Sequence, residues 1–163
     1  MNKRKFSIYT DGSYDMSDRV GASACVILNK DESEILFVHA TARKCDYNPE
    51  KKQRTNEQEI GAIIRAIMSV PNGSEILIHS DSQYAVKVLS GENNAYTNLD
   101  LIERYRKEVN ERNHRVSFKW VRGHDGNRYN EMADALCTKA ANDLRKDGGK
   151  LKTRESINKC FEL

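Results

Sequence analysis

The order of strand-like and helix-like segments is the feature that most limits how this chain can fold. Three β-type runs, at residues 5–11, 20–28 and 34–42, are joined by short polar links, which predicts an antiparallel meander. After residue 55, helical and strand patterns alternate. The later segments are predicted helices at 55–67, through Val86 and Leu89, at 99–112 and at 129–144, and predicted strands at 75–80 and 116–121. This order predicts an α/β fold with a mixed five-stranded sheet, in which an antiparallel meander lies beside parallel strands and helices cover both faces.

Length and composition indicate a single soluble domain. The chain has 163 residues, enough to bury a core without disulfides or a structural metal, and 38% of them are hydrophobic. No apolar run approaches the roughly 20 residues that span a bilayer, and the N-terminus has no signal-peptide pattern. We therefore expect a cytoplasmic protein without a membrane partner, and a monomer. The net charge of +3 permits nucleic-acid binding without requiring it.

Four carboxylates occupy comparable positions at the ends of predicted elements. Asp11 ends the first strand and Asp81 follows the strand at 75–80, while Glu59 opens a helix and Asp134 lies early in the last one. Taken alone, Asp11 followed by Gly12 also fits a hairpin turn. Because ligands in α/β sheets bind at the carboxyl ends of strands, a compact fold could bring the four acids to one edge.

Clustered carboxylates repel, and the repulsion indicates what they bind. Two charges 4 Å apart cost about 4 kcal/mol at an effective dielectric of 20. Such a cluster either raises some of its own pKa values or binds cations. Carboxylates without histidine or cysteine at ligand spacing favour Mg²⁺ or Mn²⁺ over zinc. Two Mg²⁺ ions about 3.5 to 4 Å apart would suit phosphodiester hydrolysis without a nucleophilic side chain.

Five motifs carry a resemblance to a known family. They are Tyr-Thr-Asp-Gly-Ser at 9–13, Thr55-Asn56 with Glu59-Ile60, Ser-Asp-Ser-Gln-Tyr at 80–84, Trp120-Val121 with Gly-His-Asp-Gly at 123–126, and Asn130-Glu131 with Ala133-Asp134. In this order, over about residues 5–143, the chain resembles the ribonuclease H family of bacteria and retroviruses, in the version without a basic insertion. The resemblance implies a ribonuclease H-like fold for residues 1–144. Residues 145–163 contain several Lys and Arg and show little periodicity, so we expect a weakly ordered basic C-terminal extension.

The resemblance also implies the chemistry. The substrate would be the RNA strand of an RNA/DNA hybrid, cut to leave a 5′-phosphate and a 3′-hydroxyl, with two Mg²⁺ or Mn²⁺ ions at one site. His124 would help with proton transfer or product release. The implied metal ligands are Asp11, Glu59, Asp81 and Asp134. The implied contacts to the hybrid are Gly12, Ser13, Thr55, Asn56, Gln83 and Asn130.

Two departures from the family pattern leave questions open. The family spaces its Thr-Asn pair three residues before the glutamate, but here only Glu57 and Gln58 intervene, so Glu57 competes with Glu59 as the ligand. We favour Glu59, because the family's carboxylate is followed directly by an apolar residue and two small ones, as in Ile60-Gly61-Ala62 here. In addition, the loop at 91–98 contains no Lys or Arg that could grip a hybrid, and the basic extension could compensate.

Two other functions compete with hybrid hydrolysis. A non-catalytic hybrid-binding module would keep the groove and lose a metal ligand, yet all four acids are present. An integrase-like or junction-resolving nuclease of the same fold would lack the Gly-His-x-Gly-x-x-x-Asn-Glu-x-Ala-Asp pattern at 123–134. Trp120, taken alone, is expected in the core, and Thr55 or Asn56 is expected to cap the helix that follows.

Overall fold

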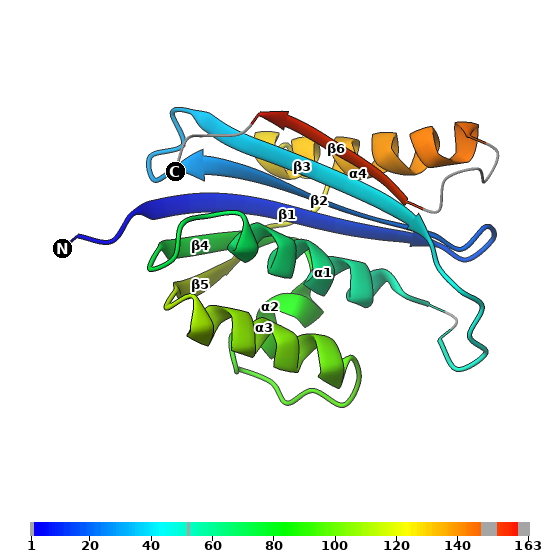
Figure 1. The fold of residues 1–163 in the computed structure, drawn as a ribbon, viewed down its shortest axis with the longest axis horizontal. Helices are drawn as coiled ribbons and strands as arrows, with labels where there is room; N and C mark the ends of the chain where they lie inside the picture. The colour runs from blue at the N-terminus through cyan, green and yellow to red at the C-terminus, as the bar shows by residue number, and fades with distance from the viewer. Residues whose placement is uncertain (1, 52, 148–152, 160–163) are drawn as a thin grey trace.

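One mixed sheet organises the molecule. The computed structural model describes residues 2–51, 53–147 and 153–159, and its sheet has the strand order β5-β4-β1-β2-β3-β6 (Figure 1). The strands are β1 (Lys5–Asp15), β2 (Val20–Asn29), β3 (Ile35–Lys44), β4 (Glu75–Ser80), β5 (Arg115–Trp120) and β6 (Thr153–Lys159). The helices are α1 (Thr55–Met68), α2 (Gln83–Leu89), α3 (Leu99–Glu111) and α4 (Arg128–Lys146).

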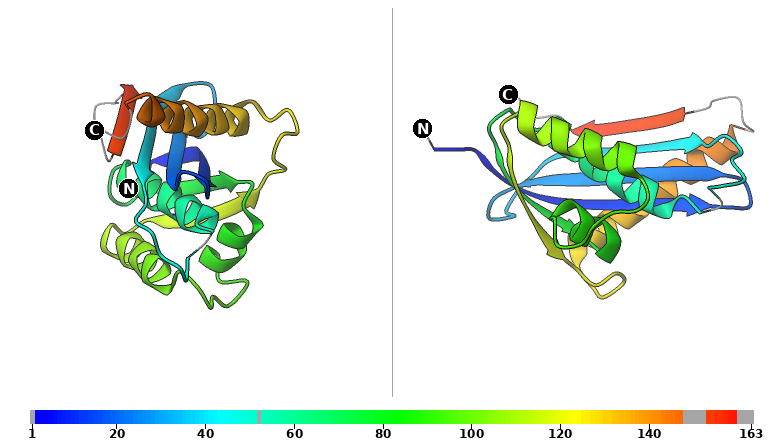
Figure 2. Two further views of the ribbon diagram at one scale, coloured as in Figure 1. Left: turned by 90° about the vertical axis from the view of Figure 1, so that its right-hand side faces the viewer. Right: turned by 90° about the horizontal axis from the view of Figure 1, so that it is seen from below.

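The predicted mixed sheet is confirmed. β1, β2 and β3 form the antiparallel meander, while β4 pairs parallel with β1 and β5 pairs parallel with β4. Helix α1 covers one face and contacts α3, and α4 packs on the other face against β1, β2 and β3 (Figure 2). Among the described residues, no helix is both long and apolar enough to cross a membrane.

Alternating side chains of the central strand serve the cores on the two faces. Ile8 packs with the isoleucines of α1, whereas its neighbour Tyr9 packs with Ala133 of α4. Helix α1 buries Ile60, Ile63 and Ile67 completely, as their helical spacing predicts. Each such side chain contributes about 1.5 to 3 kcal/mol of hydrophobic stabilisation. The two cores thus hold α1 and α4, which carry acidic residues, against the strand that carries Asp11.

The first strand is longer than the sequence predicts. β1 continues four residues past Asp11 to Asp15 and pairs with β2 along that length, so Asp11 and Gly12 lie inside a strand and form no turn. The sequence prediction failed here because Asp and Gly are poor strand formers, whereas cross-strand pairing decides the local structure.

The predicted cap of α1 is also wrong. Arg54 occupies the N-cap position and makes no side-chain capping bond, while Thr55 and Asn56 are the first two helical residues. The Thr55 N–H and hydroxyl instead donate to the side-chain oxygen of Gln53, at 2.9 and 2.6 Å. The Asn56 side chain therefore stays at the exposed surface.

Part of the basic extension forms a sixth strand. Residues 153–159 pair antiparallel with the edge strand β3, although the sequence there shows little periodicity. Main-chain hydrogen bonds to an open edge require no apolar alternation, which explains the discrepancy. The parts of the extension at 148–152 and 160–163 lie outside the described residues, and its role as a separate basic segment stays a prediction.

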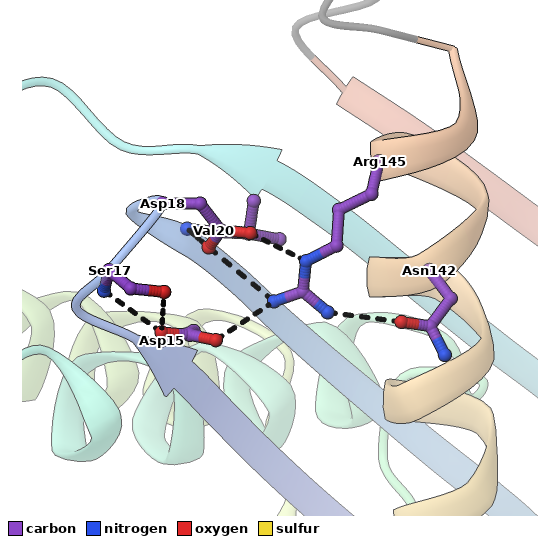
Figure 3. A network of polar contacts seen from close by, with 6 residues as sticks. All are labelled: Asp15, Ser17, Asp18, Val20, Asn142 and Arg145. Carbon is purple, nitrogen blue, oxygen red and sulfur yellow. Dashed lines mark hydrogen bonds and ion pairs between the residues drawn. The ribbon is translucent and has the colours of Figure 1, made fainter.

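Arg145, the first cation of that extension, is already engaged within the protein. Its guanidinium Nε donates to Asp18 at 2.6 Å and its Nη2 lies 3.4 Å from Asp15, while Nη1 donates to Asn142 (Figure 3). The hydrogen bond from Arg145 lowers the pKa of Asp18. Arg145 therefore ties the end of α4 to the β1–β2 turn.

Candidate active site

The candidate site forms where β4 ends beside β1. The parallel pairing of β1 with β4 covers only Lys5–Tyr9, although β1 itself continues to Asp15. Asp11 thus lies on a stretch of β1 that pairs with β2 on one side and with none of the described strands on the other. Asp81 is the first residue after β4 and lies at this same edge. The chain order predicted each of these acids at the end of a strand; Asp81 does follow β4, whereas Asp11 lies inside β1, and the register explains why the two meet.

Gly12 allows helix α1 to approach this edge. A Cβ atom at Gly12 would lie 2.4 Å from the backbone nitrogen of Glu59 and 2.5 Å from the carbonyl carbon of Gln58. Real Cβ atoms essentially never come this close, so only glycine fits here. The first two turns of α1 can therefore pack directly on β1, which brings Glu59 to Asp11.

Three carboxylates converge at the edge and the fourth contacts them. One oxygen each from Asp11, Glu59 and Asp81 lie within 4.8 Å of one another. Asp134, from the second turn of α4, is close enough to Asp11 to share a side-chain hydrogen bond that raises the pKa of Asp11. The structure thus brings together all four predicted metal ligands.

The cluster retains protons because its charges are buried together. Burial, then the charges of Asp81 and Asp134, raise the pKa of Asp11 to about 7. Burial, then Asp11 and Asp81, raise the pKa of Glu59 to about 9. Burial also raises the pKa of Asp81, although a hydrogen bond from Asn130 and the charge of His124 act in the opposite direction.

The geometry separates Glu59 from its rival. Glu59 is 4% exposed and faces Asp11, whereas Glu57 is surrounded by cations. Its carboxylate lies 3.7 Å from Arg43, 3.9 Å from Lys51 and 3.7 Å from Arg54. Glu57 therefore contributes to a basic group of residues, and Glu59 takes the place among the acids that the sequence analysis favoured.

His124 lies on the loop between β5 and α4. It has a positive φ of 55° and an exposed side chain, and its charge acts on Asp81. Gly123 and Gly126, which flank it, have different structural roles. Gly126 also has a positive φ, of 79°, whereas a Cβ at Gly123 would lie 2.9 Å from the Oδ2 atom of Asp81.

The predicted hybrid contacts divide by exposure. Asn56 and Gln83 are exposed, Ser13 and Thr55 are half-buried, and each lies within four residues of one of the acids. Gly12 is buried and has the packing purpose described above. Asn130 is 3% exposed and its side chain bonds to the carboxylate of Asp81, a role that the motif did not reveal.

Trp120 is a second residue that sequence reasoning misplaced. It is 44% exposed, not buried in the core, and its indole N–H donates to the backbone oxygen of Asp81 at 3.1 Å. β5 is an edge strand and Trp120 is its last residue, so one side of the ring meets solvent. The only signal in the sequence was its place at the end of a strand, three residues before the Gly123 loop.

A mixed α/β sheet with four carboxylates gathered at the edge where β4 ends beside β1 suits a hydrolase that is assisted by bound cations. Comparisons identify the family. Residues 3–142 match the family model described as RNase H. A ribonuclease H of Lachnoclostridium phytofermentans is 31% identical over 163 aligned residues, which cover 90% of this chain and 95% of that protein. The chain therefore belongs to the RNase H family, and it is a ribonuclease H enzyme.

Solved structures share the fold. RNase H1 from the halophilic archaeon Halobacterium salinarum NRC-1 superposes with a TM-score of 0.67 at 23% identity, covering 85% of this chain and 98% of that one. LC11-RNase H1 in complex with an RNA/DNA hybrid superposes with a TM-score of 0.71 at 18% identity, covering 86% and 99%. The family depends on divalent metal ions.

The acidic cluster suits such an ion. Buried oxygen ligands with raised pKa values gain from any cation that replaces their protons. The Oε2 atom of Glu59 is buried and has no hydrogen-bond partner within the described protein, so it has an open coordination position. Hard carboxylate ligands without a thiolate fit Mg²⁺ or Mn²⁺.

Proposed function

We propose that this protein is an endoribonuclease that hydrolyses the RNA strand of RNA/DNA hybrids. We further propose two Mg²⁺ ions per site, for which Mn²⁺ can substitute, and products with 5′-phosphate and 3′-hydroxyl ends. The observation that carries the proposal is the convergence of Asp11, Glu59 and Asp81 within 4.8 Å, with Asp134 bonded to Asp11. Bound divalent cations supply charge neutralisation at the phosphate and lower the pKa of the attacking water.

The protein's own residues have two roles in this reaction, cation binding and proton transfer. The four carboxylates hold the cations at an edge that stays open because β4 ends there. His124, exposed and close to Asp81, is placed to accept or return a proton near the scissile phosphate. His124 lies on an exposed loop, outside the buried carboxylate cluster. This position suits a side chain that moves during proton transfer or product release.

Selectivity for hybrids would come from the polar residues that flank the acids. Ser13, Asn56 and Gln83 lie two or three residues from Asp11, Glu59 and Asp81 in the chain, and all three are at least partly exposed. The 2′-hydroxyl is what lets a protein distinguish RNA from DNA. These hydroxyl and amide groups suit contacts with 2′-hydroxyls and base edges of the minor groove.

The basic side chains that contact the substrate phosphates lie beside α1. Arg43, Lys51 and Arg54 place three positive charges around the one carboxylate of Glu57, in the first turn of the helix that carries Glu59. This basic group leaves an excess of positive charge around Glu57, two residues along the chain from Glu59. These basic side chains bind the hybrid's phosphates, which the loop at 91–98 cannot do because it contains no Lys or Arg.

Salt dependence tests this assignment. Replacing both Arg43 and Lys51 by Gln should weaken hybrid binding and reduce the slope of log K against log salt by nearly 2, because each phosphate contact contributes about 0.9. Arg145→Gln is the matched control, since two carboxylates, Asp15 and Asp18, surround its one guanidinium, whereas Arg43 and Lys51 share the single carboxylate of Glu57 with Arg54. A slope that falls for Arg145→Gln and not for the double variant would place the grip in the C-terminal extension.

Cleavage of labelled duplexes tests the proposed function itself. RNA/DNA, RNA/RNA and DNA/DNA duplexes are compared with and without Mg²⁺, and the ends of the products are analysed. We expect cutting of the RNA strand of the hybrid alone, only with the cation, and poor cutting at a single embedded ribonucleotide. Efficient cutting of DNA would favour an integrase-like nuclease, and binding of the hybrid without cleavage would favour a binding module.

A further inference from the structure

Trp120, the one tryptophan of the chain, contacts the backbone of a proposed metal ligand. In the pairing of β4 with β5, Trp120 is the partner of Ser80, the residue just before Asp81. Its indole Nε1–H donates to the backbone oxygen of Asp81 at 3.1 Å. The ring is 44% exposed, so it lies at the surface immediately beside the acidic edge.

This hydrogen bond replaces a sheet bond that Asp81 cannot make. The backbone oxygen of Ser80 accepts the last main-chain bond at this point, from the Val121 N–H at 2.9 Å. One residue later β4 has ended, and α2 begins at Gln83. A backbone carbonyl left without a partner costs free energy, so the indole N–H stabilises one orientation of the peptide that joins Asp81 to Ser82.

The carboxylate of Asp81 is held by the segment that continues from Trp120. Gly123 packs so closely that a Cβ there would lie 2.9 Å from Oδ2 of Asp81. Asn130, at the start of α4, gives the same carboxylate a side-chain hydrogen bond. Residues 120–130 thus restrain Asp81 at both its backbone and its side chain.

We infer that Trp120 is a positioning residue for Asp81, and that its ring reports cation binding at the acidic edge. The inference rests on the proposed function, because it takes Asp81 as a metal ligand. In this role the indole contacts the backbone of Asp81 and not the reacting atoms. It acts by keeping the Asp81 backbone in the one orientation from which the carboxylate faces Asp11 and Glu59.

Intrinsic fluorescence of the wild-type protein gives the first test. Mg²⁺ is titrated at constant ionic strength into the full chain, and emission from the one indole is recorded. We expect a saturable change in intensity or wavelength that follows the binding isotherm measured by calorimetry. Asp81→Asn should remove the change. If the emission intensity and wavelength do not change with Mg²⁺ while calorimetry detects binding, the inference is overturned and the proposed function stays intact.

Removing the indole N–H gives the second test. Trp120→Phe should raise the half-saturating Mg²⁺ concentration about 3- to 10-fold, as expected for one lost hydrogen bond, with little change in KM for the hybrid. Phe118→Leu, on the same strand, is the control and should lower stability without changing Mg²⁺ affinity. If Trp120→Phe fails to fold, incorporation of benzothienylalanine keeps the bicyclic ring and removes only the N–H.

The outcomes distinguish the two ideas. Unchanged Mg²⁺ affinity in folded Trp120→Phe or in the benzothienylalanine protein would refute the positioning role. Wild-type protein that binds no Mg²⁺ in calorimetry would instead refute the proposed function. A raised half-saturating concentration in Trp120→Phe, with Phe118→Leu normal, would support the role that the geometry assigns to Trp120.

Discussion

Asp11→Asn should make the metal-free protein more stable, although it removes a residue of the active site. In the folded protein the pKa of Asp11 rises from 3.8 to about 7, chiefly through burial and then through Asp81 and Asp134. An acid with a raised pKa binds its proton more tightly in the folded state, so folding opposes its ionisation. The penalty is small at pH values near 4 and grows as the pH rises towards 7.

The size of the effect follows from the two pKa values. With about 1.4 kcal/mol per pKa unit, the raised pKa of Asp11 lowers the free energy of unfolding by up to about 4 kcal/mol at pH 8. At pH 5, where Asp11 ionises only in the unfolded chain, the loss is about 2 kcal/mol. An asparagine has no such penalty, so Asp11→Asn should gain up to those amounts. In a chain of this length, 1 kcal/mol corresponds to roughly 2 to 4 °C in Tm.

Urea unfolding in EDTA at pH 5 and pH 8 measures this gain. Asp15→Asn is the matched control on the same strand, because hydrogen bonds from Ser17 lower the pKa of Asp15 and its ionised form is favoured. That control should lose stability or leave it unchanged. With saturating Mg²⁺ the order should reverse, since the cation stabilises only the protein that binds it.

Two results would refute this reasoning. Equal stability of Asp11→Asn and the wild type at pH 8 in EDTA would mean that the acids do not repel in the folded state. A gain that is as large at pH 5 as at pH 8 would mean that it arises from something other than ionisation. Undiminished cleavage by Asp11→Asn would separately remove Asp11 from the metal site.

Four further variants test the site. Glu59→Gln should abolish Mg²⁺-dependent cleavage, whereas Glu57→Gln should keep turnover and alter hybrid affinity; the reverse result would exchange their roles. Gly12→Ala should destabilise the protein by about 1 to 3 kcal/mol in urea unfolding and reduce cleavage, because its Cβ would push α1 away; normal stability and activity would show that this contact is not required. His124→Ala should lower kcat by about 10²- to 10⁴-fold with a nearly constant KM; a steep rise in the Mg²⁺ requirement would instead make His124 a ligand.

The identity of the acids and the order of the elements could be predicted from the sequence because both depend on local patterns. The isoleucines of α1 recur at helical spacing, and the strand before Asp81 is a short apolar run. Motifs around Asp11, Asp81 and Asp134 keep their order, so the family resemblance did not require a structure. Glu59 was harder, because two glutamates two residues apart fit the motif almost equally well.

Tertiary structure decided the features that depend on segments far apart in the chain. Glu57 and Glu59 differ because one turns towards Arg43 and the other towards Asp11. Gly12 allows a close contact with α1, whereas the sequence alone predicts a turn at Asp11 and Gly12. β6 forms because β3 offers an open edge, through main-chain bonds that leave no side-chain pattern. The sequence determined which groups the site contains, whereas packing of α1 and α4 on opposite faces of β1 determined how close their charges lie and thus why they retain protons.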